Sequence, residues 1–166
     1  MRELEYPFNG ALLLKKRKAL KRQLLEEQRD WLDKRIAILG GSTTHDIRDM
    51  LELFLLNQGI RPAFYESEYA QYWQDAMFPN PALEEFRPDV IYVHTSLRNL
   101  TAFPALTDSP EQVEELLRAQ YARFEGMWER LGEVYACPVI QNNFEYPFCL
   151  PSASALRTIS SAVSPA

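Results

Sequence analysis

The residues best suited to chemistry follow a short apolar run near the start of the chain. Residues 36–39 have the length of a strand, and two glycines and the hydroxyl side chains of Ser42 and Thr43 come directly after them. Glycines permit a sharp turn and hydroxyl residues cap helices, so the pattern predicts a buried strand that turns into a helix. Such a turn could hold a nucleophile, bind an anion at the helix start, or be only a well-formed connection.

Three further strand ends should bring polar residues to the same edge of a sheet. Apolar or β-branched runs at 61–66, 88–95 and 137–141 predict strands, and helical segments between them predict parallel connections. The carboxyl ends of parallel strands meet at one edge, where ligands commonly bind. The candidate binding residues at this edge are Gly40, Gly41, Thr43, Glu66, Ser67, Ser96, Arg98, Asn142 and Asn143.

A serine on the first turn with a distant asparagine resembles the SGNH (GDSL-type) hydrolases. Their first block is Gly-Asp-Ser, and their third block supplies an oxyanion-hole Asn. The resemblance implies that Ser42 is a nucleophile and that Asn99 and nearby backbone N–H groups stabilise an oxyanion. Two features differ: Gly41 replaces the usual Asp, and no Asp or His follows Asn143, where the family has its activating pair.

Two histidines are the candidate bases. His45 lies three residues after Ser42, whereas His94 lies in a predicted strand, a position more typical of a structural histidine. A serine without a base is a poor nucleophile, so hydrolysis by this chain alone is the weaker interpretation. Ser42 could instead only cap its helix.

The composition fits one globular domain with unevenly distributed charge. The 166 residues are 46% hydrophobic, enough for a substantial core, and the formal net charge is −5. Residues 1–35 hold 10 of the 18 basic and 6 of the 23 acidic residues, so this segment carries +4 and the remainder −9. An acidic body argues against general nucleic-acid binding, which needs a broad basic surface.

The sequence also bears on compartment and on metal binding. No stretch approaches 18 apolar residues, and the N-terminus lacks the apolar core of a secretory signal. We therefore expect a cytoplasmic protein in which Cys137 and Cys149 are reduced. His-x-x-x-His and Cys-x-x-Cys groups are absent, so we expect neither a metal site nor a cofactor.

A first helix should span about 10–34 and carry a basic face. Leu13, Leu20, Leu24 and Trp31 fall on one apolar stripe. The basic face is either solvated or a docking surface for an acidic partner protein or an anionic membrane. Its candidate docking residues are Lys15, Lys16, Lys18, Lys21 and Arg22.

The order of elements predicts the fold class. Helical periodicity at 43–57, at 69–77 and in a long segment that follows Ser109-Pro110 alternates with the predicted strands. This order predicts an α/β protein, a flavodoxin-like or SGNH-like three-layer α/β/α sandwich with a mostly parallel sheet. We expect an N-terminal helical segment at 1–34, an α/β domain at 35–148 and a low-information tail at 149–166.

The motifs in combination resemble the N-terminal, SGNH-hydrolase-like domain of FkbH-like proteins, also called HAD-superfamily subfamily IIIC phosphatases. The resemblance covers about residues 3–148 and rests on Glu5-Tyr-Pro-Phe8, the basic helix, 35–49, Phe64-Tyr-Glu-Ser-Glu-Tyr69, Asp75-Ala-Met-Phe78, Val93-His-Thr-Ser-Leu-Arg-Asn99 and Gln141-Asn-Asn-Phe-Glu-Tyr-Pro147. In that family a HAD domain with an Asp-x-Asp-x-Thr motif follows, and this sequence has no such motif. We interpret the chain as a truncated product, an excised domain or a stand-alone copy.

The resemblance implies two main functions. The leading interpretation is a binding or accessory domain that recognises an acyl carrier protein, a capsular-polysaccharide or polyketide precursor, or a HAD-domain partner. The alternative is a serine esterase or acyltransferase that uses Ser42, with a base from His45, His94 or another chain. A purely structural or oligomeric role is a third interpretation. The sequence specifies neither the ligand nor the oligomeric state.

Overall fold

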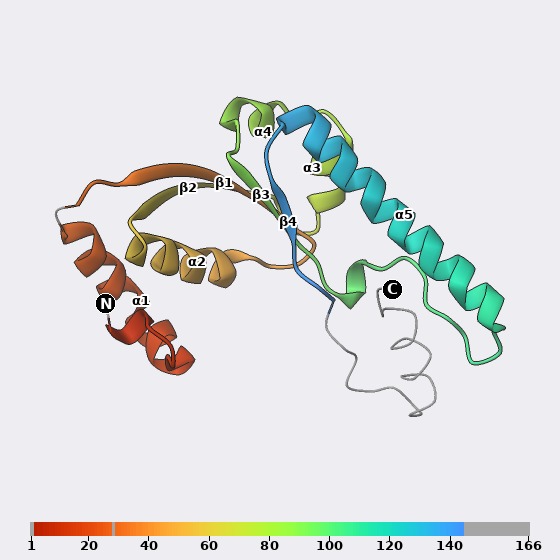
Figure 1. Cartoon of the computed structure of the whole chain (residues 1–166), viewed down its shortest axis with the longest axis horizontal. Helices are drawn as coiled ribbons and strands as arrows, with labels where there is room; N and C mark the ends of the chain where they lie inside the picture. The colour runs from red at the N-terminus through yellow and green to blue at the C-terminus, as the bar shows by residue number, and fades with distance from the viewer. Residues whose placement is uncertain (1, 28, 145–166) are drawn as a thin grey trace.

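The structure, a computed structural model, describes residues 2–27 and 29–144 and contains a parallel sheet (Figure 1). Within this part of the chain the sheet has four strands, in the order β2-β1-β3-β4. The central strand pairs with both neighbours, since Ile36 lies opposite Phe64 on one side and Val90 on the other. The bounds are β1 Leu32–Gly40, β2 Ile60–Glu66, β3 Val90–His94 and β4 Val139–Gln141.

Helices cover both faces of this sheet and make it the middle of three layers. Alternate residues of a strand point to opposite faces. Ala37 and Leu39 of β1 pack with the helices of one face, and Ile36 and Ile38 are buried on the other. The first face is covered by α3 Tyr72–Met77, α4 Pro81–Phe86 and α5 Pro110–Tyr135, and the second by α2 His45–Asn57. The predicted three-layer α/β fold is confirmed.

The N-terminal helix, α1 Gly10–Glu26, packs on α2 rather than directly on the sheet. Its leucine stripe is confirmed, because Leu13, Leu20 and Leu24 are buried in one cluster with Leu53 and Leu56 of α2. Asn9 caps the helix by accepting a hydrogen bond from the backbone N–H of Leu12. A short 3-10 turn, η1 Arg2–Leu4, precedes it and places Leu4 in the same cluster.

The predicted extent of this helix to residue 34 is wrong. The helix ends at Glu26, and Glu27 already has extended backbone angles. From Leu32 onward the chain pairs with β2, so its backbone groups make hydrogen bonds in the sheet instead of in a helix. Trp31 therefore lies outside the helix, although it still packs against the same apolar cluster. The division at residue 34 stays a prediction, and the predicted tail at 149–166 lies outside the described residues.

Several other boundaries differ from the predictions for local reasons. Helix α2 begins two residues later than expected, because Thr44 is its N-cap. The aromatic segment at 69–77 becomes helical only from Tyr72, since Ala70 adopts a left-handed backbone conformation. Helix α4 was not predicted; Pro81 begins it and Asn80 caps it. The long helix α5 begins as predicted, with the Ser109 and Gln112 capping box in place.

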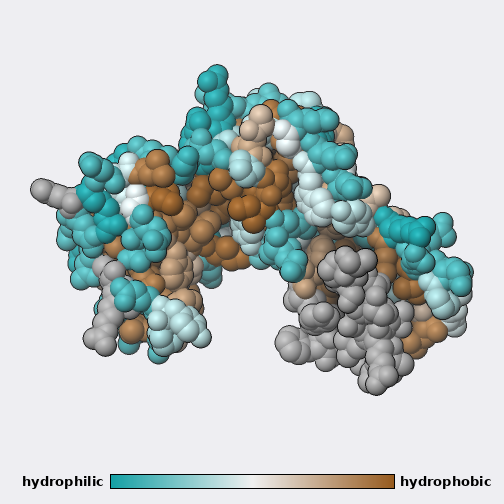
Figure 2. Space-filling view, viewed as in Figure 1, coloured by the Kyte–Doolittle hydropathy of each residue, from teal (hydrophilic) through white to brown (hydrophobic). Residues whose placement is uncertain are grey.

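The surface reflects this layering. Figure 2 shows hydrophobic residues gathered in the middle of the molecule and hydrophilic residues along the outer side of α5 and over much of the α1 end. Among the described residues, none of the helices combines the length and apolarity needed to span a bilayer.

Candidate functional site

The turn after β1 is built by two glycines that make close contacts. A Cβ atom on Gly41 would lie 2.5 Å from Asn99 Oδ1, and a Cβ atom on Gly40 would lie 2.8 Å from Thr44 Cγ2. The Gly41 N–H also donates a 2.7 Å hydrogen bond to the carbonyl oxygen of His94 at the end of β3. Gly41 thus lets the β1 turn and the segment after β3 approach each other closely, and Gly40 lets the turn fold tightly against Thr44, as expected for Gly at such contacts.

Asn99 joins the turn after β1 to the turn after β3. Its Nδ2 donates to the carbonyl oxygen of Gly41 at 3.0 Å, and its Oδ1 accepts from the backbone N–H of Ser96 at 2.8 Å. Ser96 and Asn99 form the capping box of a short 3-10 turn, η2 Leu97–Asn99. The amide that the SGNH resemblance assigns to an oxyanion therefore holds a backbone carbonyl next to Ser42.

Glu66 anchors the helix that follows the turn. Buried Thr44 donates through Oγ1 to Glu66 Oε1 at 2.6 Å, and Arg48 donates through Nη1 to Oε2 at 3.0 Å. Arg48 also donates to Asp49 at 2.9 Å, and this hydrogen bond holds the pKa of Asp49 below its ordinary value. Glu66, predicted as a binding residue, thus ties β2 to α2.

Thr44, rather than Ser42, occupies the N-cap position of α2. The interpretation that Ser42 merely caps this helix is therefore wrong. The hydroxyl of Thr44 makes no capping hydrogen bond, because it donates to Glu66 instead.

Ser67 also belongs to the framework of the edge. Its N–H donates to the carbonyl oxygen of Ile38 at 2.9 Å, and its hydroxyl donates to Asp75 Oδ2 at 2.5 Å. Asp75 also accepts from the Tyr65 hydroxyl and from Asn80 Nδ2, so its carboxylate closes the loop after β2. Burial raises the pKa of Tyr65, which favours the neutral hydroxyl in this cluster.

Asn142 fixes the fourth strand end. Its side chain pairs with the backbone of buried Thr95: Oδ1 accepts from the N–H at 2.9 Å and Nδ2 donates to the carbonyl at 2.7 Å. Gln141 donates to the Thr95 hydroxyl at 2.9 Å and accepts from Trp128 Nε1 at 2.7 Å. The ends of β3 and β4 are thereby locked together and to α5.

Four predicted residues remain open to a ligand at this framed edge. Ser42 is half-buried, and Thr43, Arg98 and Asn143 are exposed. Among residues 2–27 and 29–144, no hydrogen bond engages the Ser42 hydroxyl and no ion pair engages Arg98. The structure thus separates the predicted set into framework residues and residues that are at least partly exposed at this edge.

The two histidines have other neighbours than Ser42. His45 is exposed, and its Nε2 lies 3.5 Å from Arg48 Nη2 and 3.7 Å from Asp49 Oδ2. The Nδ1 of His94 lies 3.1 Å from the Tyr92 hydroxyl. In the described part of the chain, neither imidazole is hydrogen bonded to Ser42. Ser42 and the two candidate bases therefore do not form a nucleophile–base pair.

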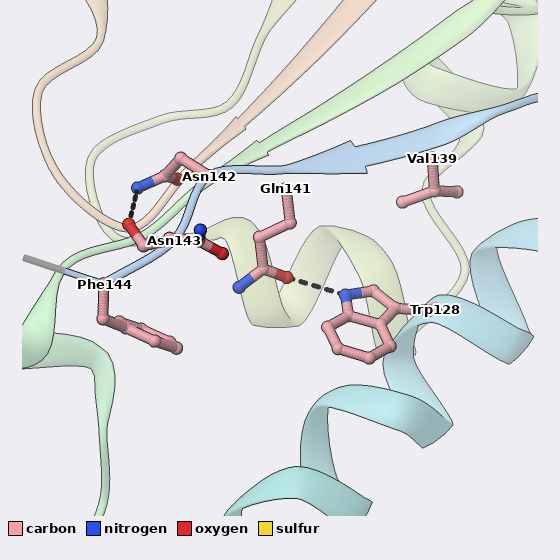
Figure 3. A pocket seen from close by; sticks show the side chains of 6 residues that line it. All are labelled: Trp128, Val139, Gln141, Asn142, Asn143 and Phe144. Atoms are coloured by element: carbon pink, nitrogen blue, oxygen red, sulfur yellow. Dashed lines mark hydrogen bonds between the residues drawn. The ribbon is translucent and has the colours of Figure 1, made fainter. Parts of the chain in front are cut away.

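A cavity of about 470 Å³ opens beside the end of β4 (Figure 3). It is lined by Trp128, Val139, Gln141, Asn142, Asn143 and Phe144. The predicted residues Asn142 and Asn143 thus adjoin a hollow with an aromatic wall. Sequence reasoning missed Trp128 because its spacing on α5 fits an ordinary core stripe. A second cavity, about 340 Å³, lies away from this edge, around Arg35 and Tyr135.

Arg123 is a further residue that sequence reasoning missed. Its guanidinium carbon lies 3.9 Å from the ring centroid of Trp73, and its nitrogens donate to the Asn99 carbonyl and the Tyr72 hydroxyl, both at 3.4 Å. It thereby connects α5 and α3 to the η2 turn that holds Asn99. No local motif marks this arginine, because its partners come from distant segments.

The predicted docking residues of α1 also divide in two. Lys21 pairs with Glu52 of α2 at 2.7 Å, and neighbouring Arg17 pairs with Asp46 at 2.7 Å. The exposed remainder is Lys15, Lys16, Lys18 and Arg22. Within the described residues, no group of three or more His, Cys, Asp or Glu side chains is arranged to hold a metal ion.

Comparison with known proteins supports the fold. No family model matches the chain, and none of the curated proteins matches it. A solved structure that resembles it is the "N-terminal part of the protein BF1531 from Bacteroides fragilis containing phosphatase domain complexed with Mg", with a TM-score of 0.65 and 20% sequence identity. The match covers 87% of this chain and 37% of that chain. The likeness shows a shared α/β fold, and this chain spans little more than a third of the neighbour's length.

Proposed function

We propose that this chain is an SGNH-like accessory domain of the FkbH-like (HAD IIIC) type, which binds a polar ligand at the carboxyl edge of its sheet and works with a phosphatase-domain partner. The observation that carries the proposal is the hydrogen bond from Asn99 Nδ2 to the carbonyl oxygen of Gly41. The Asn99 amide is engaged in holding the edge, whereas no hydrogen bond among residues 2–27 and 29–144 engages the hydroxyl of Ser42 beside it. A rigid frame with free polar groups suits recognition.

The comparison supports the choice of partner. The similar structure is described as containing a phosphatase domain, and this chain matches only 37% of it. An accessory domain of this fold would therefore act beside a separate phosphatase domain. Its ligand would be either a part of the phosphatase substrate or the arm of a carrier protein. The polysaccharide and polyketide precursors with which FkbH-like proteins are associated are examples of such ligands. The open groups of Ser42, Thr43, Arg98 and Asn143 suit a ligand rich in hydroxyl or phosphate oxygens.

Calorimetry tests this proposal. The purified chain is titrated with an isolated HAD-type phosphatase domain and, separately, with the holo form of an acyl carrier protein. We expect saturable binding of at least one of them, and about a tenfold loss of affinity in Arg98→Ala. Arg118→Ala is the control, because Arg118 is an exposed arginine on α5 that pairs only with Glu114 among the described residues. No binding of either protein would remove the proposal's main support.

A second candidate function is ester hydrolysis or acyl transfer by Ser42. Ser42 is half-buried at the strand end, and its hydroxyl makes no hydrogen bond within the described part of the chain, which favours this function with a base supplied by His45, His94 or another chain. Hydrolysis of p-nitrophenyl acetate by the wild-type chain and by Ser42→Ala is the measurement. Turnover that the substitution abolishes would establish this function in place of simple recognition, and turnover equal in both proteins would dispose of it.

A further inference from the structure

Helix α1 presents a basic outer face that its own fold leaves unpaired. Lys15, Lys18 and Arg22 are exposed and follow the i, i+3, i+7 spacing of one helical stripe. Leu14 and Leu25 flank this stripe and are 51% and 46% exposed. We call these five residues the basic face. Its only ion pair among the described residues is a 3.9 Å contact between Arg22 and Glu26 on the same helix.

The basic face is held firmly in place from behind. The opposite side of α1 buries its leucines against α2, as described above. Arg17 and Lys21 add ion pairs to Asp46, Asp49 and Glu52 of α2. The remaining cations therefore project from a fixed helix. Binding of a partner would lose little conformational entropy in the α1 backbone, because that backbone is already ordered.

Helix α5 presents an acidic outer face. All six glutamates of this helix are exposed, and one of them, Glu114, pairs with Arg118. Leu117 and Tyr121 lie beside them in the first half of the helix and are 39% and 58% exposed. The acidic face comprises Glu111, Glu114, Glu115, Leu117, Tyr121, Glu125, Glu129 and Glu133.

The two faces cannot satisfy each other within one molecule. Helices α1 and α5 lie at opposite ends of the structure in Figure 1. No ion pair links them among residues 2–27 and 29–144. Each face also combines charge with a pair of exposed apolar side chains, so the two resemble complementary halves of one helix–helix contact.

We propose that this chain associates head to tail, with the basic face of one copy against the acidic face of α5 in a second copy. Where only one such pair of faces joins two copies, the contact is heterologous and produces a ring or an open chain of subunits. Two helix faces form a small interface, and its attraction is mainly electrostatic. The association is therefore weak and declines as salt screens the charges.

Sedimentation velocity on the 166-residue chain tests the proposal at low and high salt. At about 0.1 mM protein and low salt, we expect species larger than the monomer, and we expect about 0.5 M salt to dissociate them. The basic-face variant is Lys15→Glu/Lys18→Glu/Arg22→Glu, and the acidic-face variant is Glu114→Lys/Glu125→Lys/Glu129→Lys. For each variant alone, the self-association constant should be at least about tenfold lower than that of the wild-type chain. Circular dichroism checks that both variants remain folded.

Mixing the two variants provides the decisive arm. The reversed basic face of one variant matches the reversed acidic face of the other, so the mixture should again form complexes. Glu3→Lys/Glu68→Lys/Glu85→Lys supplies the matched control, because it makes the same change of net charge at exposed glutamates outside both faces. Added to the basic-face variant in one chain, these substitutions restore the net charge but leave both faces acidic, so that chain should stay monomeric. A wild-type chain that stays monomeric, an association insensitive to salt, or self-association of that control chain at the wild-type level would overturn the proposal.

Discussion

The Nδ2 of Asn99 donates a hydrogen bond to the carbonyl oxygen of Gly41 at 3.0 Å, across 58 residues of sequence. The contact brings the β3 turn against the β1 turn so closely that residue 41 has no room for a Cβ atom. Two loops that belong to different βα units therefore behave as one structural piece. Any ligand at this edge would meet groups whose positions are fixed by the sheet.

Replacement of Gly41 by alanine should destabilise the protein by about 1–3 kcal/mol, the usual cost of overpacking. The new Cβ would lie 2.5 Å from Asn99 Oδ1, so Asn99 would have to give up its hydrogen bonds to Gly41 and Ser96. Urea unfolding measures the change. Gly126→Ala in α5 is the control: nothing lies within 4 Å of its added Cβ, and it should stabilise the helix by about 0.5–1 kcal/mol.

The double variant Gly41→Ala/Asn99→Ala separates the clash from other effects. Removal of the Asn99 amide leaves space for the alanine methyl group. The double variant should therefore lose less stability than the sum of the losses in Gly41→Ala and Asn99→Ala. Strict additivity would mean that the contact between these residues does not limit position 41.

Asn142 and its neighbour Asn143 should differ sharply in their importance for stability. Asn142→Ala removes both hydrogen bonds to the buried Thr95 backbone and should cost about 1–3 kcal/mol. Asn143→Ala removes an exposed amide and should change the free energy of unfolding by less than about 0.5 kcal/mol. Thermal or urea unfolding of the two variants is sufficient. Equal losses would contradict the framework role given to Asn142.

The fold followed from sequence because its signals are local. The apolar run at 36–39, the Ser109-Pro110 cap and the alternation of helix with strand all depend on neighbouring residues. The edge location of the candidate site followed as well, since parallel strands end together. The sequence did not reveal which polar side chains would make hydrogen bonds within the protein at this edge of the sheet. Asn99, Glu66 and Asn142 find their partners through the tertiary fold, and no spacing encodes those partners.

The end of α1 shows the limit of periodicity. Trp31 continues the leucine stripe by spacing and packs on the same cluster, yet it lies between α1 and β1, outside both elements. A helix and a strand that follow one another against one apolar surface can both satisfy a simple hydrophobic pattern. Pairing of Leu32 with Ile60 decides between them, and that pairing depends on a strand 28 residues away.

Two adjacent leucines should show how firmly α1 is attached. Leu24 has no exposed surface and lies in the cluster with Leu53 and Leu56, so Leu24→Ala should cost about 2–5 kcal/mol. Leu25 is 46% exposed, and Leu25→Ala should cost less than about 0.5 kcal/mol. Urea unfolding gives both values. A small effect of Leu24→Ala would mean that α1 packs loosely, and the fixed support assumed for the basic face would be lost.

Asp89 should make the protein less stable as the pH becomes acidic. Its carboxylate accepts a 2.7 Å hydrogen bond from the backbone N–H of Arg35, and this bond holds the pKa of Asp89 below its ordinary value in the folded state. Between the lower folded pKa and the higher unfolded pKa, the unfolded chain binds more protons, so stability rises with pH in that window. The contribution is present above about pH 4 and is lost as the pH falls through the folded pKa.

Asp89→Asn removes this titration while it keeps an oxygen that can accept from Arg35. The variant should therefore show a shallower decline of stability between about pH 5 and pH 2, a window set by the ordinary aspartate pKa and its downward shift. Part of the decline should persist, because the pKa of Asp49 is also lowered, by its hydrogen bond from Arg48. Urea midpoints measured across this range compare the two proteins. Acid limbs of equal slope would show that the Arg35–Asp89 contact does not couple to folding.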